Sequence, residues 1–158
     1  MARKIVVGSD HGGLELKRQL CEGLAGWGWT VEDVGCSTAQ SVDYPDFAET
    51  VGRKVADGEA DVGLLICGTG IGMCIAANKV RGVRAALCHE CYSAQMARAH
   101  NDANVLCLGG RVVGPELARQ VLATFLESSF EGGRHQRRLD KIASFERTGP
   151  SGPGSTEG

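Results

Sequence analysis

The chain has 158 residues, of which 42% are hydrophobic and 23% charged, and its formal net charge is −2. A chain of this length can bury roughly 70% of its unfolded surface without disulfide staples, and its charge excludes a general attraction to nucleic acid or membranes. Its seven cysteines are an odd number scattered through apolar segments, no signal peptide is apparent and no apolar run approaches the ~18 residues of a transmembrane helix, so we expect a reduced, cytoplasmic protein.

Strand-like and helix-like runs alternate along the chain. The pattern predicts five strands, over residues 4–8, 30–34, 61–66, 83–87 and 105–108. It predicts helices between and after them, over residues 14–24, 47–55, 71–80, 92–99, 116–126 and 134–147. Strands that alternate with helices form parallel sheets covered on both faces. We therefore expect a three-layer α/β/α Rossmann-like sandwich with a five-stranded parallel sheet, in a single domain over residues 1–147.

Residues 148–158 differ from the rest of the chain. They contain four glycines, two prolines and no large apolar side chain. This composition predicts a disordered tail.

The first candidate site segment follows the first predicted strand and reads Ser9-Asp10-His11-Gly12-Gly13. In open α/β sheets ligands bind outside the carboxyl ends of the strands. Asp10 and His11 could bind hydroxyl groups and an anion there. The alternative is that Ser9 or Asp10 merely caps the following helix. Tyr44, next to Pro45, is a third polar group in such a loop.

The most informative segment follows the apolar run over residues 62–66. It reads Cys67-Gly68-Thr69-Gly70-Ile71-Gly72 and leads into a predicted helix. A glycine-rich turn at a helix start presents free backbone amides that can stabilise negative charge on an oxygen, although a tight turn without a ligand is the alternative. Met73 breaks the dinucleotide fingerprint and no Gly-Lys-Ser/Thr follows, so nucleotide binding by those routes is disfavoured.

Cys67 itself stands at the start of this turn. The positive end of the helix and the free amides should favour its thiolate form. It could then act as a nucleophile or as a base. The alternative is a small buried hydrophobe, the usual role of cysteine.

Two further segments carry ionisable groups. His100 ends the fourth predicted helix, where a protonated imidazole is favoured and could act as an acid; the alternative is a surface cap with Asn101 in the left-handed conformation. Arg134 and Arg138 lie four apart on the last helix and could clamp a phosphate, with Arg111 as a third contact. The alternative is a solvated face whose arginines pair with acidic neighbours, Glu131 or Asp140.

A metal site is disfavoured. Cys88-His89-Glu90-Cys91 offers one pair of thiolates, and no second pair with suitable spacing completes four ligands.

Together these segments resemble the sugar-phosphate isomerase family that contains the B-type ribose-5-phosphate isomerases, the galactose-6-phosphate isomerase subunits and allose-6-phosphate isomerase. The resemblance runs from about residue 4 to residue 147. Besides the segments above, it rests on the motifs Asp43-Tyr44-Pro45, Ala76-Ala77-Asn78-Lys79, Tyr92-Ser93-Ala94-Gln95, Arg111-Val112-Val113-Gly114 and Glu131-Gly132-Gly133-Arg134-His135.

The resemblance implies interconversion of an aldose phosphate and a ketose phosphate, ribose 5-phosphate and ribulose 5-phosphate above all, through a cis-enediolate and without a metal or other cofactor. It implies that Cys67 is the base, since Met73 stands where some members of the family have a glutamate. His100 would assist ring opening. Enediolate and substrate would be held by Asp10, His11, Tyr44, Gly68, Thr69, Gly70, Ile71, Gly72, Asn101, Arg111, Arg134 and Arg138.

The resemblance further implies a homodimer, or a dimer of dimers, whose active sites lie at the interface. Two alternatives stay open. The substrate could be a six-carbon sugar phosphate such as allose or galactose 6-phosphate, or the chain could be a sugar-phosphate-binding module without turnover.

Overall fold

The structure is a computed structural model that describes residues 2–147. Its elements follow one another in the order β1 (Lys4–Ser9), α1 (Leu14–Gly26), β2 (Thr30–Asp33), α2 (Tyr44–Ala56), β3 (Val62–Cys67), α3 (Ile71–Ala77), β4 (Ala85–Leu87), α4 (Cys91–Ala99), β5 (Val105–Gly109), α5 (Pro115–Glu127) and α6 (Arg134–Arg147). The strands form one parallel sheet in the order β2-β1-β3-β5-β4, which confirms the predicted architecture. The predicted tail, 148–158, lies outside the described residues.

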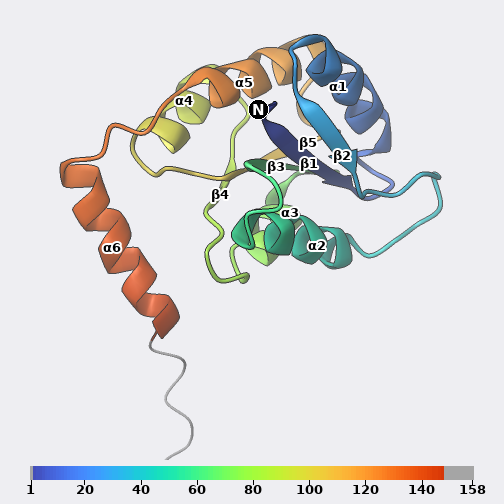
Figure 1. Ribbon diagram of the computed structural model, residues 1–158. Helices are drawn as coiled ribbons and strands as arrows, with labels where there is room; N and C mark the ends of the chain where they lie inside the picture. The colour runs from blue at the N-terminus through green and yellow to red at the C-terminus, as the bar shows by residue number, and fades with distance from the viewer. Residues whose placement is uncertain (1, 148–158) are drawn as a thin grey trace, which may run out of the picture.

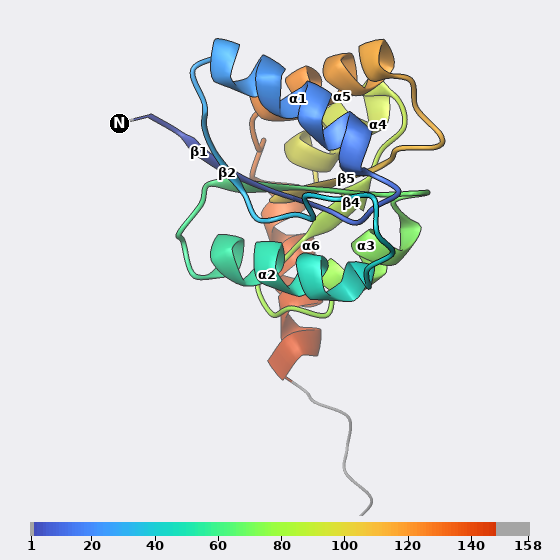
Figure 2. The same ribbon diagram turned by 90° about the vertical axis from the view of Figure 1, so that its right-hand side faces the viewer.

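Helices cover both faces of the sheet (Figures 1 and 2). Helices α1, α4 and α5 lie on one face, and α2 and α3 lie on the other. Central strand β3 is buried along its whole length, which explains its continuous apolar sequence. Leu64 and Ile66 pack into the core under α1, α4 and α5, whereas Leu65 and Cys67 pack under α2 and α3. Successive side chains of a strand point to opposite faces, so this alternation fixes the face on which the Cys67 thiol lies.

Two helix boundaries differ from the predicted ones by three residues, and the other differences are smaller. Helix α2 begins at Tyr44, with Pro45 in its first turn, where a missing amide hydrogen costs little. Helix α3 ends at Ala77 rather than at residue 80. Asn78 follows it, and its side chain exchanges two hydrogen bonds with the backbone of Ala85, from Nδ2 to the carbonyl oxygen at 3.0 Å and from the amide to Oδ1 at 2.9 Å. These bonds tie the end of α3 to the start of β4.

Helix α6 stands apart from the three layers (Figure 1). His135 and Leu139 are buried near its start, whereas Ile142 and Phe145 are largely exposed. The carboxylate of Glu146 accepts a hydrogen bond from the amide of Gly82. The helix thus presents apolar side chains away from the core of its own chain.

None of the helices within residues 2–147 combines the length and the apolar character that crossing a membrane requires.

Candidate active site

The loops after β1, β3 and β5 meet at the carboxyl ends of these strands, along one edge of the sheet. The strand order reverses between β1 and β3, the position where ligands bind in open α/β sheets. The amide of Gly110 donates to the carbonyl of Cys67 at 2.8 Å, and a Cβ atom on Gly110 would lie 2.7 Å from the carbonyl oxygen of Gly12. Only residues without a side chain allow the three loops to approach this closely.

The Cys67 turn folds back onto its own sulfur. Gly70 has a φ of 77°, and its amide donates to Cys67 Sγ at 3.1 Å. The amide of Ile71 donates to Thr69 Oγ1 at 3.3 Å. These two amides are therefore engaged inside the turn, and the amides of Gly68, Thr69 and Gly72 are the remaining candidates for binding an oxyanion.

The β1 loop is ordered by its own side chains. Asp10 is buried, and its Oδ1 accepts hydrogen bonds from the amides of Gly12 at 2.9 Å and Gly13 at 3.1 Å. Asp10 thus orders the loop before α1 and stands beside the Cys67 turn. The N-cap residue of α1 is Gly13 and no side chain caps the helix, so the capping alternative is wrong. His11 Nδ1 accepts from the amide of Val42 at 3.3 Å, so a neutral His11 carries its proton on Nε2.

Tyr44 and Arg111 lie against the same turn. A Cβ atom on Gly72 would lie 2.6 Å from the ring of Tyr44, and one on Gly68 would lie 3.1 Å from Nη1 of Arg111. The amide of Arg111 donates to the carbonyl of Gly68 at 3.0 Å. The structure thus brings Asp10, His11, Tyr44, Arg111 and residues 67–72 to one edge of the sheet, which we call the thiol edge.

The other predicted site residues lie at the opposite edge of the sheet, beside the amino ends of the strands. His100 and Asn101 follow α4 and precede β5, and the backbone of Glu131, just before α6, donates to the carbonyl of Ala99 at 3.0 Å. Strand β5 has five residues, each of which adds about 3.3 Å, so the two edges are roughly 17 Å apart. We call this region, with His100, Asn101, Arg134 and Arg138, the histidine edge. One chain does not bring its two groups of predicted residues together.

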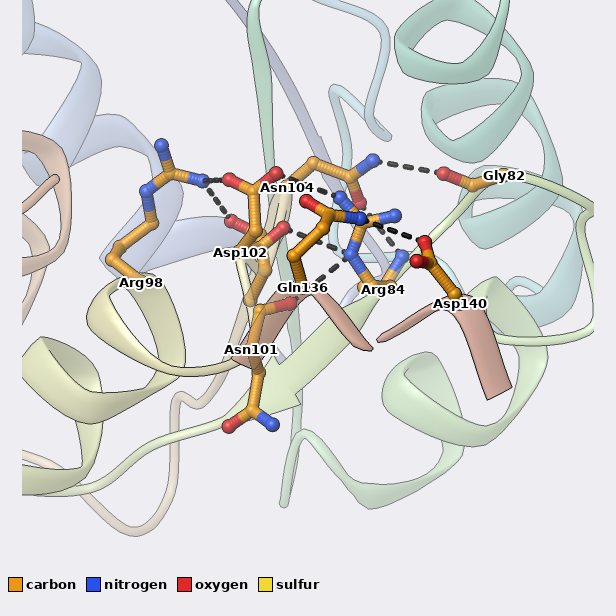
Figure 3. Close-up of polar contacts among 9 residues, drawn as sticks. Gly82, Arg84, Arg98, Asn101, Asp102, Asn104, Gln136 and Asp140 are labelled. Atoms are coloured by element: carbon orange, nitrogen blue, oxygen red, sulfur yellow. Dashed lines mark hydrogen bonds and ion pairs between the residues drawn. The ribbon is translucent and has the colours of Figure 1, made fainter. Parts of the chain in front are cut away.

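A polar network orders the turn that carries His100 and Asn101 (Figure 3). Arg84 Nε donates to the carbonyl oxygens of Asn101 and Asp102, both at 3.0 Å, and the Asp102 carboxylate pairs with Arg84 at 3.1 Å and Arg98 at 3.0 Å. Asp102, with a φ of 43°, adopts the left-handed conformation. The alternative that gave this conformation to Asn101 is therefore wrong by one residue, because the two arginines hold Asp102 in the turn.

Arg134 and Arg138 are exposed on the first turns of α6. Within residues 2–147 neither forms an ion pair, and the same holds for Arg111. The expected acidic partners are used elsewhere, since Glu131 faces two histidines and Asp140 accepts from Gln136 at 2.8 Å. The alternative of a paired surface is thus contradicted, and three guanidinium groups are available to an anion.

Sequence patterns missed a cluster beside them. The rings of His100 and His135 stack with centroids 4.2 Å apart, and the Glu131 carboxylate lies 3.8 Å from Nε2 of His100 and 3.4 Å from Nε2 of His135. Burial lowers the pKa of His135, the positive charges of His100 and Arg134 lower it further, and Glu131 opposes them. The Glu-x-x-x-His spacing of Glu131 and His135 was the one sequence signal for this cluster. His100 is distant in the sequence and joins the cluster only when the chain folds.

The Cys88–Cys91 segment is used structurally. Glu90 caps α4 by accepting from the amide of Ser93 at 2.9 Å, and burial raises the pKa of Cys88 to about 11. His89, in the same segment, accepts from the amide of Gly109 at 3.3 Å and so links the ends of β4 and β5. Within the described residues these two thiols belong to no cluster of potential metal ligands.

The family model described as Ribose/Galactose Isomerase matches residues 5–142. Ribose-5-phosphate isomerase B of Escherichia coli strain K12 is 48% identical over 145 residues, which cover 92% of this chain and 97% of that protein. D-erythrulose-4-phosphate isomerase of Pectobacterium atrosepticum is 46% identical over 143 residues, 90% of this chain and 94% of that protein.

A solved structure agrees in fold. Ribose-5-phosphate isomerase B of Mycoplasma genitalium, crystallised with bound ribulose 5-phosphate, is 46% identical and superposes with a TM-score of 0.90. The match covers 94% of this chain and 99% of that one. The likeness therefore extends over the whole sheet and its helices.

Proposed function

The chain belongs to the ribose/galactose isomerase family, and on that premise we propose that it is an aldose–ketose isomerase that interconverts ribose 5-phosphate and ribulose 5-phosphate. The observation that carries this proposal is the Cys67 turn, which combines a thiol, uncommitted backbone amides and a nearby guanidinium group. Proton transfer at a carbon next to a carbonyl needs a base and a stabiliser of the enediolate.

The thiolate of Cys67 acts as the base. It removes the proton from C2 of the open-chain aldose, and the electron pair of that bond forms the C1–C2 double bond as negative charge develops on O1. The same proton returns to C1, while the O2 proton passes to O1 and O2 becomes the carbonyl oxygen. The sum is an isomerisation that consumes no oxidant and needs no second substrate.

The developing charge is held by the turn itself. The amides of Gly68, Thr69 and Gly72 are the candidates for this role, because those of Gly70 and Ile71 are engaged within the turn. Since Thr69 Oγ1 already accepts a hydrogen bond from Ile71, its own hydroxyl proton is available to an enediolate oxygen. Such preorganised donors usually provide the largest part of transition-state stabilisation.

Phosphate binding requires groups from both edges of the sheet. Arg111 and His11 lie at the thiol edge, whereas Arg134 and Arg138 lie at the histidine edge together with His100 and Asn101. We therefore infer a two-fold dimer in which the thiol edge of one chain faces the histidine edge of its partner. Isologous contacts of this kind are the commonest in homo-oligomers. The exposed apolar side chains of α6 support the same inference.

The proposal includes three further points. The reaction needs no metal, the enzyme acts in the cytoplasm, and it serves the non-oxidative branch of the pentose phosphate pathway.

The decisive experiment is an assay of the purified protein with ribose 5-phosphate, with and without a metal chelator. Allose 6-phosphate, galactose 6-phosphate and erythrulose 4-phosphate form the comparison panel. We expect the highest kcat/KM with ribose 5-phosphate and no loss of rate with the chelator. A clear preference for another sugar phosphate would overturn the proposed assignment of ribose 5-phosphate as the substrate. Binding of all four sugar phosphates without turnover would favour a non-catalytic module.

A further inference from the structure

Two thiols outside the proposed catalytic groups meet between helix α3 and strand β5. Cys107 lies on β5 and is fully buried on the face of the sheet that α2 and α3 cover. Cys74 lies on α3, is half-buried and packs into the same cluster of apolar side chains. The Cys107 thiol donates a hydrogen bond to Cys74 Sγ, so the two sulfurs are neighbours.

The surroundings of the two sulfurs make them unlike in acidity. The hydrogen bond from Cys107 lowers the pKa of Cys74 to about 7, and weaker bonds from the Leu87 amide and from Asn78 Nδ2, 3.6 Å from Sγ, help against the effect of burial. The same contact with Cys74, together with burial, raises the pKa of Cys107 well above its usual range. When Cys74 is protonated, its thiol donates to the carbonyl of Ala85 at 3.5 Å. At neutral pH a large fraction of Cys74 is therefore thiolate, while Cys107 remains a thiol.

This combination is typical of an oxidation-sensitive cysteine pair. The thiolate is the form that reacts with oxidants, and sensor cysteines are accessible, have a low pKa and lie beside a second cysteine that resolves the oxidised form. Cys74 meets these three conditions, because it is half-exposed and touches Cys107. Cys21 is equally half-buried, but burial raises its pKa to about 11.

We propose that hydrogen peroxide oxidises Cys74 and Cys107 to a disulfide that reversibly inhibits the isomerase. The Cys74 sulfur attacks one oxygen of the peroxide, the O–O bond breaks, and a sulfenic acid forms while the leaving hydroxide takes up a proton as water. The Cys107 sulfur then attacks the Cys74 sulfur. The S–O bond breaks, and the hydroxyl group leaves with the Cys107 proton as a second water. Two thiols are oxidised, and one peroxide is reduced to two waters.

The inhibitory effect follows from the position of Cys74 on the first turn of α3. Its amide donates to the carbonyl of Gly70 at 3.0 Å, and the amide of Gly70 donates to Cys67 Sγ at 3.1 Å. A covalent bond holds two sulfurs much closer than a hydrogen bond does, so oxidation draws α3 toward β5. Gly70 cannot follow, because a Cβ atom there would already lie 2.5 Å from Leu87 Cδ1. The turn around Cys67 must therefore shift.

The two parts of this inference have separate supports. Inhibition rests on the proposed function, since it assumes that the Cys67 turn performs the isomerisation. The disulfide itself rests only on the contact and the chemistry of the two thiols.

Mass spectrometry of the purified protein, exposed to a few equivalents of hydrogen peroxide, tests the disulfide without any assay of activity. We expect each chain to lose two hydrogen atoms and to regain them with dithiothreitol. After the remaining thiols are alkylated, trypsin should release peptide 55–79 joined to peptide 99–111. Fragment ions must place the bond at Cys74, because peptide 55–79 also contains Cys67.

Two variants make this test specific. Cys74→Ser removes the proposed peroxide-reactive thiol at nearly constant volume. Cys21→Ser is the matched control, because it removes a half-buried thiol from α1, outside the pair. We expect the cross-link in the wild type and in Cys21→Ser, and none in Cys74→Ser. A bond from Cys67 to Cys107, or oxidation of Cys74 to a sulfinic acid without a disulfide, would overturn the pair.

Activity is then measured after the same exposure, each variant against its own untreated rate. The wild type and Cys21→Ser should lose most of their rate and regain it with dithiothreitol, whereas Cys74→Ser should be inactivated at least about tenfold more slowly. Full activity of the cross-linked protein would overturn the inhibitory role alone. A chain that forms the disulfide between Cys74 and Cys107 but does not isomerise ribose 5-phosphate before treatment would contradict the proposed function and leave the thiol pair standing.

Discussion

Cys67 is a buried thiol whose sulfur accepts a hydrogen bond from the backbone at the start of a helix. Such a bond stabilises a thiolate more than a thiol, because the donor faces a full negative charge. The sulfur is thereby suited to hold negative charge before it takes a proton and again after it has returned that proton.

Replacing Cys67 by alanine removes the proposed base and little else. Loss of a positioned general base typically costs roughly 10²–10⁴-fold in rate, and we expect a fall in kcat within this range with KM changed little. Steady-state kinetics with ribose 5-phosphate measures it. Cys21→Ala, a half-buried thiol on α1, is the control and should retain the wild-type rate. A Cys67→Ala variant with wild-type kcat would show that the base is another group.

Cys74 should be the thiol with the lowest pKa among those with clear shifts. A hydrogen bond from Cys107 lowers the pKa of Cys74 to about 7, with smaller help from Leu87 and Asn78 against the effect of burial. Burial instead raises the pKa of Cys21 to about 11. Because only the thiolate is alkylated, labelling of Cys74 by iodoacetamide should rise through a midpoint near 7 and that of Cys21 only in strong alkali. Mass spectrometry of peptides labelled between pH 6 and pH 9 tests this order. Faster labelling of Cys21 than of Cys74 would refute it.

At this scale the sequence predicts residues whose roles depend on their neighbours along the chain. The Cys67 turn and the Asp10 loop are of this kind, since strand, turn and helix start all lie within a few positions. The contacts of His100 with Glu131 and His135, and of His89 with Gly109, form only when distant segments meet. A single sequence contains no pattern from which their contacts follow.

At the scale of elements, the start of helix α3 requires a glycine at position 70. Gly70 has a φ of 77°, and a Cβ atom there would lie 2.5 Å from Leu87 Cδ1 and 2.8 Å from the carbonyl carbon of Leu108. The left-handed strain of a non-glycine residue and the overlap together cost about 2–4 kcal/mol. We expect Gly70→Ala to lower the free energy of unfolding by this amount, measured by urea denaturation.

The matched control should change the free energy of unfolding in the opposite direction. Gly23 lies inside α1, and a Cβ atom there would meet nothing within 4 Å. Gly23→Ala should raise the free energy of unfolding by about 0.5–1 kcal/mol, because alanine loses less backbone entropy in a helix. Equal effects of the two substitutions would mean that the conformation of Gly70 is not required.

The elements were predictable because apolar periodicity and turn residues act locally. All the strands and helices exist where the patterns put them, and the errors lie at their ends, one of which is set by a tertiary contact. Helix α3 stops at Ala77 because Asn78 binds the backbone of Ala85, a residue of another strand. The composition of residues 78–80 alone gives no reason for the helix to stop there.

For the whole molecule, strand order was the main unknown. Strand β5 lies between β3 and β4 although it follows both in the chain, and this order determines which loops meet beside Cys67. Parallel strands that are buried on both faces have similar apolar sequences, so their neighbours cannot be read from one sequence. The separation of the predicted site residues into two edges became visible only once this order was known.

A complementation experiment tests whether two chains share each site. Cys67→Ala damages the thiol edge, and Arg134→Ala with Arg138→Ala damages the histidine edge, so dimers of either variant alone should be nearly inactive. When both are expressed together, half of the dimers are mixed, and each mixed dimer has one intact site. Recovery of about a quarter of the wild-type activity is expected for a two-fold dimer. No recovery in mixed dimers isolated by two different tags would contradict shared sites.

In the proposed dimer, the distance between the two edges also has a genetic consequence. A chain damaged at one edge spoils one of the two sites when it pairs with a normal chain, so it behaves as a recessive lesion with partial loss. A chain damaged at both edges spoils its own site and that of its normal partner, and it acts as a dominant inhibitor in any cell that makes both. The number of edges affected, rather than the severity of either lesion, then decides the inheritance of the defect.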